Sequence, residues 1–333
     1  MNAIEIRNLS KYFFPSKREK QGHRIPQKPV KDRAPTNIIR AVDNINFEIK
    51  KGEIFGFLGP NGAGKTTTIR MLTGVLKPTN GSILIFGEEF RDNPIKIKEI
   101  MGHVPEEANV YTELTGMQNL CLIGELYGVS KKMRNERAES LLMKFELFEK
   151  RHLKANKYSK GMKQRLLICM ALMSNPEILF LDEPTSGLDV KSSKIIKKLI
   201  KEFNENGITI FLTTHDMNVA NELCNRIAII NQGKIISLDT PNNLKKLTQD
   251  YQAIDCYFID EVDINQIKQL PTILEVQKNN SLYHIIVKNI NDAIIEIVEF
   301  IKTNNLKVNE VSTHQPKLED AFLKIIERGV KDY

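Results

Sequence analysis

A glycine-rich segment that ends in lysine and threonine, GPNGAGKT from Gly59 to Thr66, has the residue types for binding phosphate. It matches the spacing G-x-x-x-x-G-K-[ST], follows an apolar run and opens a segment with helical spacing. We expect Lys65 to reach the β- and γ-phosphates of a nucleotide and the Thr66 hydroxyl to bind Mg²⁺. A glycine turn before a helix would explain the glycines but not the Lys-Thr pair. The predicted phosphate-binding residues are Gly59, Pro60, Asn61, Gly62, Ala63, Gly64, Lys65, Thr66 and Thr67.

Two acids and a histidine end two further apolar runs of the chain. Asp182 and Glu183 close ILFLDE, and His215 closes ITIFLTTH. We expect Asp182 to hold Mg²⁺ and Glu183 to orient and deprotonate an attacking water. Ordinary acids at a strand edge are the alternative, but a pure core strand avoids two adjacent charges. A lone histidine at a strand end is more often structural. His215 is therefore a candidate functional residue only because of the other motifs in the chain.

The stretch YSKGMKQRLLICMAL, from Tyr158 onward, narrows the class of nucleotide-binding protein. It resembles the LSGGQ signature of ATP-binding cassette (ABC) proteins. Tyr158 replaces Leu, Lys160 replaces the first Gly, and Met162 replaces Gln. The resemblance implies that Ser159 and Gly161 contact the γ-phosphate of ATP bound to the opposite subunit. It also implies ATP and Mg²⁺ as cofactors.

Other ABC landmarks follow in the family's order, so the resemblance covers about residues 3–240. EPTSGLDV contains the D-loop with Asp189, and His215 takes the place of the switch histidine. Tyr12 stands where the family has its adenine-stacking aromatic residue. Glu106 follows a proline where the family typically has Gln. Because a carboxylate coordinates Mg²⁺ well, we expect Glu106 to keep the metal-linked role.

The resemblance implies an α/β fold for residues 1–240, a P-loop NTPase cassette with a mixed core sheet, an antiparallel β subdomain and a helical subdomain. Apolar and polar residues alternate over residues 3–14, which predicts a strand. The pattern from about 95 to 155 predicts mainly helix. Beyond a boundary near 240, residues 241–333 predict a small α+β domain that resembles a split βαβ arrangement. We find no catalytic cluster in that second domain.

Charge and hydropathy limit the remaining classes of protein. The chain has 333 residues and a net charge of +7, and residues 15–37 hold seven Lys or Arg against two Asp or Glu. The basicity is therefore a local insert, which we expect to be a solvated spacer or a contact with anionic lipid, and no nucleic-acid partner is expected. No apolar run approaches the roughly 18 to 20 residues of a membrane span, and no signal pattern begins the chain. These features predict a cytoplasmic protein. We expect the four cysteines to be reduced and to pack as small hydrophobic residues.

Two functions are weighed for such a chain. The first is the nucleotide-binding subunit of an ABC exporter, peripheral on the cytoplasmic face of the membrane. It needs a separate integral-membrane permease and a second cassette, most simply as a homodimer. The loop from Glu106 to about Leu120 would then transmit closure to the permease. The segment QPKLEDAFL (315–323) resembles the ending of cassettes that serve ABC-2-type exporters of drugs, antibiotics or lipids, and it also reads as an amphipathic helix packing on its own domain.

The second function is a non-transport ABC ATPase acting on ribosomes or nucleic acid. Such relatives usually carry two cassettes in one chain or a long coiled coil, and this sequence has neither. A regulator that binds the nucleotide without turnover is opposed by the intact Glu183.

Overall fold

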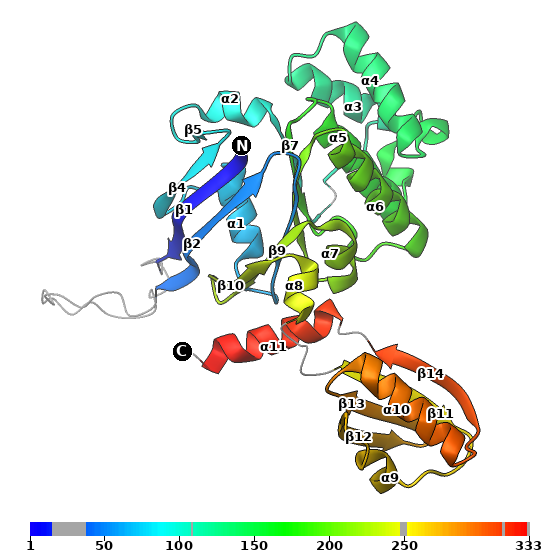
Figure 1. Ribbon diagram of the computed structural model, residues 1–333. Helices are drawn as coiled ribbons and strands as arrows, with labels where there is room; N and C mark the ends of the chain where they lie inside the picture. The colour runs from blue at the N-terminus through cyan, green and yellow to red at the C-terminus, as the bar shows by residue number, and fades with distance from the viewer. Residues whose placement is uncertain (15–37, 108, 247–251, 315–316, 332–333) are drawn as a thin grey trace, which may run out of the picture. The chain divides into compact units, whose positions relative to one another are not determined.

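The computed structural model describes residues 1–14, 38–107, 109–246, 252–314 and 317–331. The basic insert of residues 15–37 therefore lies outside the described residues. The chain divides into two compact units, Met1–Thr240 and Pro241–Tyr333, which are described separately (Figure 1).

A six-stranded sheet forms the centre of the first unit, in the order β10-β9-β3-β8-β7-β6. All neighbours are parallel except β9 and β10, which form an antiparallel hairpin. The central strands are buried on both faces, which is why they appear in the sequence as unbroken apolar runs. The parallel strands bring their carboxyl ends to one edge of the sheet. The strands are β3 (Ile54–Leu58), β6 (Met101–Val104), β7 (Ile178–Asp182), β8 (Thr209–Thr214), β9 (Arg226–Asn231) and β10 (Lys234–Asp239).

A second, antiparallel sheet packs beside the first in the order β2-β1-β4-β5, as the antiparallel subdomain requires. Its strands are β1 (Asn2–Phe13), β2 (Ile39–Lys50), β4 (Asn80–Ile85) and β5 (Glu88–Glu89). The two sheets share one apolar core with helix α1 (Lys65–Leu72). The ring of Phe47 on β2 stacks on that of Phe55 on β3, with centroids 5.2 Å apart. This packing holds the start of α1 at the end of β3.

Helices make up the rest of the first unit, as Figure 1 shows in cyan and green. They are α2 (Pro94–Glu99), α3 (Gly116–Leu126), α4 (Lys131–Lys144), α5 (Lys160–Leu172), α6 (Val190–Glu205) and α7 (Met217–Leu223). The prediction that residues 95–155 are mainly helical is wrong for one segment. Met101–Val104 is strand β6, which pairs in parallel with β7 at the sheet edge. Pairing with a distant strand decides the conformation of these four residues, and no local pattern announces it.

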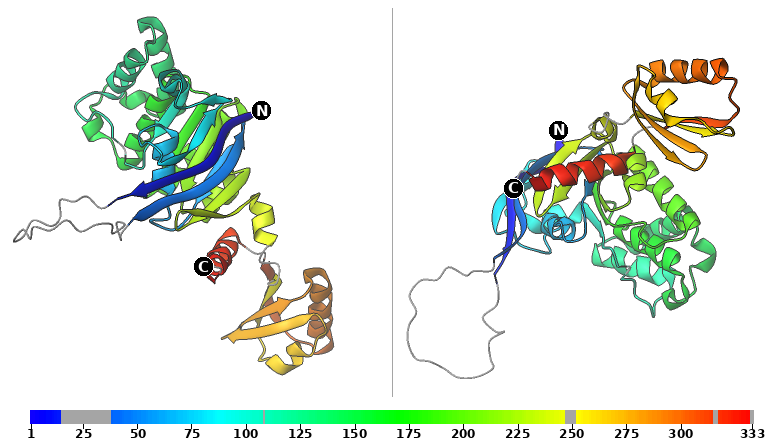
Figure 2. Two further views of the ribbon diagram at one scale, coloured as in Figure 1. Left: turned by 90° about the vertical axis from the view of Figure 1, so that its left-hand side faces the viewer. Right: turned by 90° about the horizontal axis from the view of Figure 1, so that it is seen from below.

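The second unit contains a four-stranded antiparallel sheet in the order β12-β13-β11-β14. Its elements are α8 (Pro241–Lys246), β11 (Gln252–Phe258), α9 (Ile264–Lys268), β12 (Ile273–Asn279), β13 (Leu282–Val287), α10 (Ile290–Thr303), β14 (Val308–His314) and α11 (Leu318–Lys331). Figure 2 shows α10 lying across one face of the sheet, where Ile297 joins a buried core with Tyr283 and Ile285. The strand and helix order from β11 to β14 is the predicted split βαβ pattern.

The ending that resembles ABC-2-type cassettes belongs to α11, although Gln315 and Pro316 lie outside the described residues. Leu318, Ala321 and Ile325 are buried at helical spacing, and α11 packs against α8 of the same unit. The amphipathic-helix reading of this segment is therefore confirmed.

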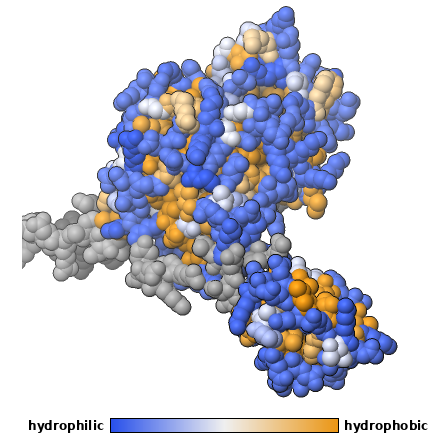
Figure 3. Space-filling view, viewed as in Figure 1, coloured by the Kyte–Doolittle hydropathy of each residue, from blue (hydrophilic) through white to orange (hydrophobic). Residues whose placement is uncertain are grey.

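Two bulk properties also follow from the described residues. No helix among them is long and apolar enough to cross a membrane, and hydrophilic residues cover most of the face seen in Figure 3. The four cysteines are free, and three of them are buried. Burial raises the pKa of the Cys224 and Cys256 thiols to about 12 each, which confirms their interpretation as small hydrophobes.

Candidate functional site

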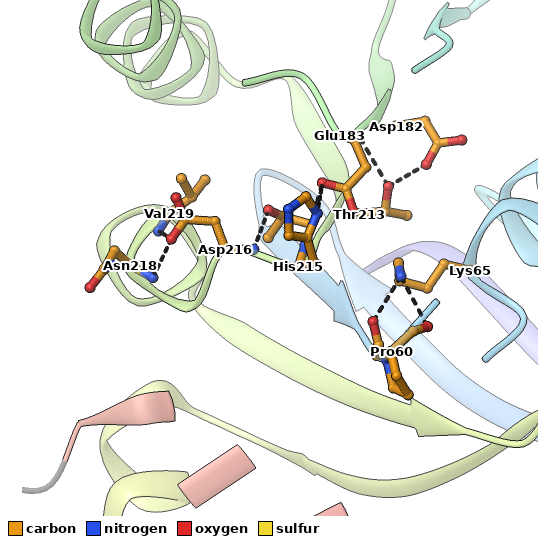
Figure 4. A network of polar contacts seen from close by, with 11 residues as sticks. Pro60, Lys65, Asp182, Glu183, Thr213, His215, Asp216, Asn218 and Val219 are labelled. Atoms are coloured by element: carbon orange, nitrogen blue, oxygen red, sulfur yellow. Dashed lines mark hydrogen bonds and ion pairs between the residues drawn. The ribbon is translucent and has the colours of Figure 1, made fainter. Parts of the chain in front are cut away.

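The glycine-rich loop connects β3 to α1 and curls tightly around one ammonium group. Gly62 and Gly64 have φ angles of +79° and +114°, which favour glycine. A Cβ at Gly64 would also meet the carbonyl oxygen of Ala41. The Lys65 ammonium donates to the carbonyl oxygen of Gly59 at 2.7 Å and to that of Pro60 at 3.3 Å (Figure 4). Because α1 begins at Lys65, the partial positive charge of the helix start faces the same space, and the loop fits a phosphate chain.

The two acids follow one another at the end of β7 but have different surroundings. Asp182 is 3% exposed, and the Thr213 hydroxyl on β8 donates to its Oδ1 at 2.5 Å. The Glu183 N–H donates to both the carbonyl and the hydroxyl oxygen of Thr213, each at 3.1 Å. Glu183 has a φ of +49°, a left-handed conformation that is uncommon for this residue type and often occurs at functional sites. Thr213 therefore fixes the Asp182 carboxylate and the backbone of Glu183.

The Glu183 carboxylate makes a side-chain pair with the histidine at the end of β8. Nδ1 of His215 lies 2.8 Å from Oε2 of Glu183, with the Glu183 side chain 8% and the His215 side chain 60% exposed. Asp216 follows directly and caps α7, since its Oδ1 accepts from the N–H groups of Asn218 and Val219 (Figure 4). This cap fixes the backbone beside His215, whose imidazole lies within hydrogen-bond distance of the Glu183 carboxylate.

The phosphate loop, Glu183 and His215 line a cavity of about 260 Å³ at the carboxyl edge of the sheet, and Asp182 is not among its lining residues. The structure therefore brings together the predicted Lys65, Thr66, Glu106, Glu183 and His215. The full lining is Ala41, Asn61, Gly62, Gly64, Lys65, Thr66, Thr67, Glu106, Glu183 and His215.

Tyr12 is not among the residues that line this cavity. Its hydroxyl donates to Oδ1 of Asp43 at 2.8 Å, and the guanidinium of Arg40 lies 5.8 Å from the centre of its ring. The neighbouring strand β2 instead contributes Ala41, which the sequence reasoning missed. Stacking of adenine on Tyr12 stays a prediction.

The signature residues form a separate group at the starts of α5 and α6. The Ser159 hydroxyl caps α5 by accepting from the N–H of Met162 at 3.2 Å. Asp189 caps α6 by accepting from the N–H and the hydroxyl of Ser192, and these hydrogen bonds hold the pKa of Asp189 below its usual value. A Cβ at Gly161 would meet the Ser192 side chain, so the two helix starts pack closely. None of these residues lines the cavity of its own chain.

Thr213 is the functional residue that sequence reasoning missed, although it lies only two positions before His215 in the same apolar run. We expect Thr213→Val to lower the free energy of unfolding by about 2 kcal/mol because it removes a donor from the buried Asp182. It should also slow ATP hydrolysis by about tenfold because Asp182 and Glu183 lose their common anchor. Chemical denaturation and phosphate release measure the two effects.

Thr209→Val is the matched control for this variant. Thr209 is fully buried at the opposite end of β8, where its hydroxyl accepts from the N–H of Gly52 at 3.0 Å. The Thr209→Val variant should lose a similar free energy of unfolding and hydrolyse ATP at the parental rate. Equal turnover in the two variants would contradict an anchoring role for Thr213.

The curled loop at the end of β3, with acids at the end of β7 and histidine after β8, defines a phosphate-loop nucleoside-triphosphatase. The family described as ABC transporter matches residues 42–186. The chain is 34% identical to the linearmycin resistance ATP-binding protein LnrL of Bacillus subtilis (strain 168), over 87% of this chain and 95% of that protein. It is 35% identical to the bacitracin transport ATP-binding protein BcrA of Bacillus licheniformis, over 87% and 94%.

Solved structures agree with these sequence matches. The dimeric structure of a post-hydrolysis ATP-binding cassette bound to ADP and Pi is similar with a TM-score of 0.61 and 30% identity, covering 71% of this chain and 98% of that one. The chain belongs to the ATP-binding proteins of ABC transporters. It binds ATP and hydrolyses it to ADP and phosphate.

Proposed function

We propose that this chain powers a separate integral-membrane permease that exports drug-like or antibiotic compounds, from the cytoplasmic face of the membrane. The cargo class rests on relatives named for linearmycin resistance and bacitracin transport, which the chain matches over more than nine-tenths of their length. The observation that carries the ATP-driven part is the Glu183–His215 pair in the same cavity as Lys65.

Within that cavity each side chain has a separate task. The loop N–H groups and the Lys65 ammonium bind the β- and γ-phosphates. Glu183 takes the proton of the attacking water, because it is the cavity carboxylate that pairs with His215. His215 orients Glu183 and lies exposed enough to donate to the γ-phosphate.

Thr66, Glu106 and Asp182 are the residues that would hold Mg²⁺. Their hydroxyl and carboxylate oxygens are the ligand types that this cation prefers, and Thr66 and Glu106 line the cavity. The ion supplies neutralising charge to the phosphates when it is bound. Glu106 would be a ligand of this ion at the position where the family usually has a glutamine.

Two copies of the chain complete each ATP site in this proposal, most simply as a homodimer. Ser159 and Asp189 are exposed, and neither they nor the buried Gly161 line the cavity of their own chain, so these residues suit the nucleotide of a second copy. A similar cassette of known structure is dimeric, which supports such pairing.

The segment before α3 is suited to carry closure to the permease. Asn119 is fully buried, and its side chain bonds the N–H and the carbonyl of Tyr111 and the carbonyl of Thr115. The segment from 111 to 115 is thereby tied to α3, while the Tyr111 side chain is half exposed. A movement of Glu106 would reach this surface along the chain.

Membrane fractionation tests the proposal. Expressed together with a candidate multi-span permease, the chain should sediment with membranes and lower the accumulation of a fluorescent drug in the cells. Expressed alone, it should stay in the supernatant and leave accumulation unchanged. Co-sedimentation with ribosomes, with no dependence on the membrane protein, would contradict a transport role.

A further inference from the structure

Lys160 is a cation in a position where helix stability disfavours one. It is the first residue of α5, directly after the Ser159 cap, where the partial positive charge of the helix start repels an ammonium. Its ammonium lies against Gly187, in the turn between β7 and α6. It has no hydrogen bond or ion pair with any residue that the structure describes. A charge kept at such a cost to the helix suggests a role outside the isolated chain.

The surrounding surface leaves this charge uncompensated. Residues 157–163 and 187–194 contain five lysines and a single acid, Asp189, whose carboxylate is bonded to Ser192. The five lysines have no ion pair within the described part of the chain, and they are Lys157, Lys160, Lys163, Lys191 and Lys194. The first residue of α6, Val190, is 87% exposed beside them. A basic surface with an exposed apolar residue fits a partner that presents negative charge.

A second copy with bound nucleotide presents that charge. Lys65 is the single lysine or arginine among the residues that line its cavity, opposite the carboxylates of Glu106 and Glu183. A bound triphosphate makes the mouth of this cavity strongly negative, and it carries one more negative charge than a diphosphate. The basic surface therefore attracts a triphosphate-loaded copy more strongly than a diphosphate-loaded one.

We propose that the Lys160 ammonium binds the γ-phosphate held by a second copy of the chain, next to the Ser159 hydroxyl. This assignment rests on the proposed pairing of two cassettes. The glycine that the ABC signature has at this position offers only backbone. Lys160 adds a full charge, so it makes pairing dependent on the third phosphate and sensitive to salt.

The test compares ATP-driven pairing of Lys160→Ala and its parent, both carrying Glu183→Gln to stop turnover. Sedimentation velocity with ATP and with ADP, at several salt concentrations, gives the dissociation constant of the dimer. We expect Lys160→Ala to raise that constant about tenfold with ATP, as for loss of a charge-assisted contact, and to flatten its salt dependence. ATP binding to the dilute monomer should not change, and thermal stability should stay equal or rise.

Two further variants separate Lys160 from net charge. Lys198→Ala removes an exposed lysine farther along α6, and it should pair like the parent. Lys160→Arg should restore most of the salt-dependent pairing. Pairing of Lys160→Ala with the parental constant and salt slope would overturn the proposal, as would an equal loss in Lys198→Ala. If the parent binds ATP but never pairs, the pairing of cassettes is wrong, and the role of Lys160 is wrong with it.

Discussion

Glu183→Gln is expected to bind ATP like the parent and to hydrolyse it about a thousandfold more slowly, as for the loss of a general base. The amide has the size of the carboxylate but cannot accept a proton from water. The backbone anchors of Glu183 to Thr213 are unaffected by the change, so the turn after β7 keeps its shape. Phosphate release under saturating ATP measures the rate, and a fluorescent ATP analogue measures the affinity.

Glu106→Gln makes the same chemical change in the same cavity and is the matched control. It restores the residue type that the ABC family usually has there, so hydrolysis should continue. Parental turnover in Glu183→Gln would show that another group accepts the proton. Loss of hydrolysis in Glu106→Gln would show that the carboxylate at 106 is required in this chain and that a glutamine cannot replace it.

Local chemistry explains why the phosphate loop was predictable from sequence. Its glycines, Lys65 and Thr66 are adjacent in the chain, and the left-handed angles of Gly62 and Gly64 follow from residue type. The position of Asp182 and Glu183 at the end of β7, and of His215 after β8, follows from the sequence for a related reason. Parallel strands end at one edge of a sheet, so side chains at strand ends meet there.

The parts that escaped prediction depend on partners far along the chain. Strand β6 exists because it pairs with β7, more than seventy residues later. Ala41 reaches the cavity because β2 lies beside β1 and brings it to the loop. Thr213 is one of three polar residues in a row at the end of the β8 run, and its bond to Asp182 exists only because β8 pairs with β7.

Lys65→Ala is expected to weaken ATP binding about a hundredfold, the upper range for hydrogen bonds to a charged group. Lys65 is 8% exposed, so its ammonium acts where water screens little. The variant leaves the carboxylates of Glu106 and Glu183 in the cavity with no opposing lysine or arginine among the lining residues. Repulsion between these acids and the phosphates then adds to the lost contact.

Arg70→Ala provides the control for Lys65→Ala, since Arg70 is an exposed cation on the same helix and does not line the cavity. Titration calorimetry with ATP should give a parental constant for Arg70→Ala and a weak one for Lys65→Ala. Thermal unfolding without nucleotide checks that both variants fold. Tight ATP binding by a folded Lys65→Ala chain would mean that backbone N–H groups of the loop alone hold the phosphates. The ammonium, bonded to the carbonyls of Gly59 and Pro60, would then serve only to keep the loop curled.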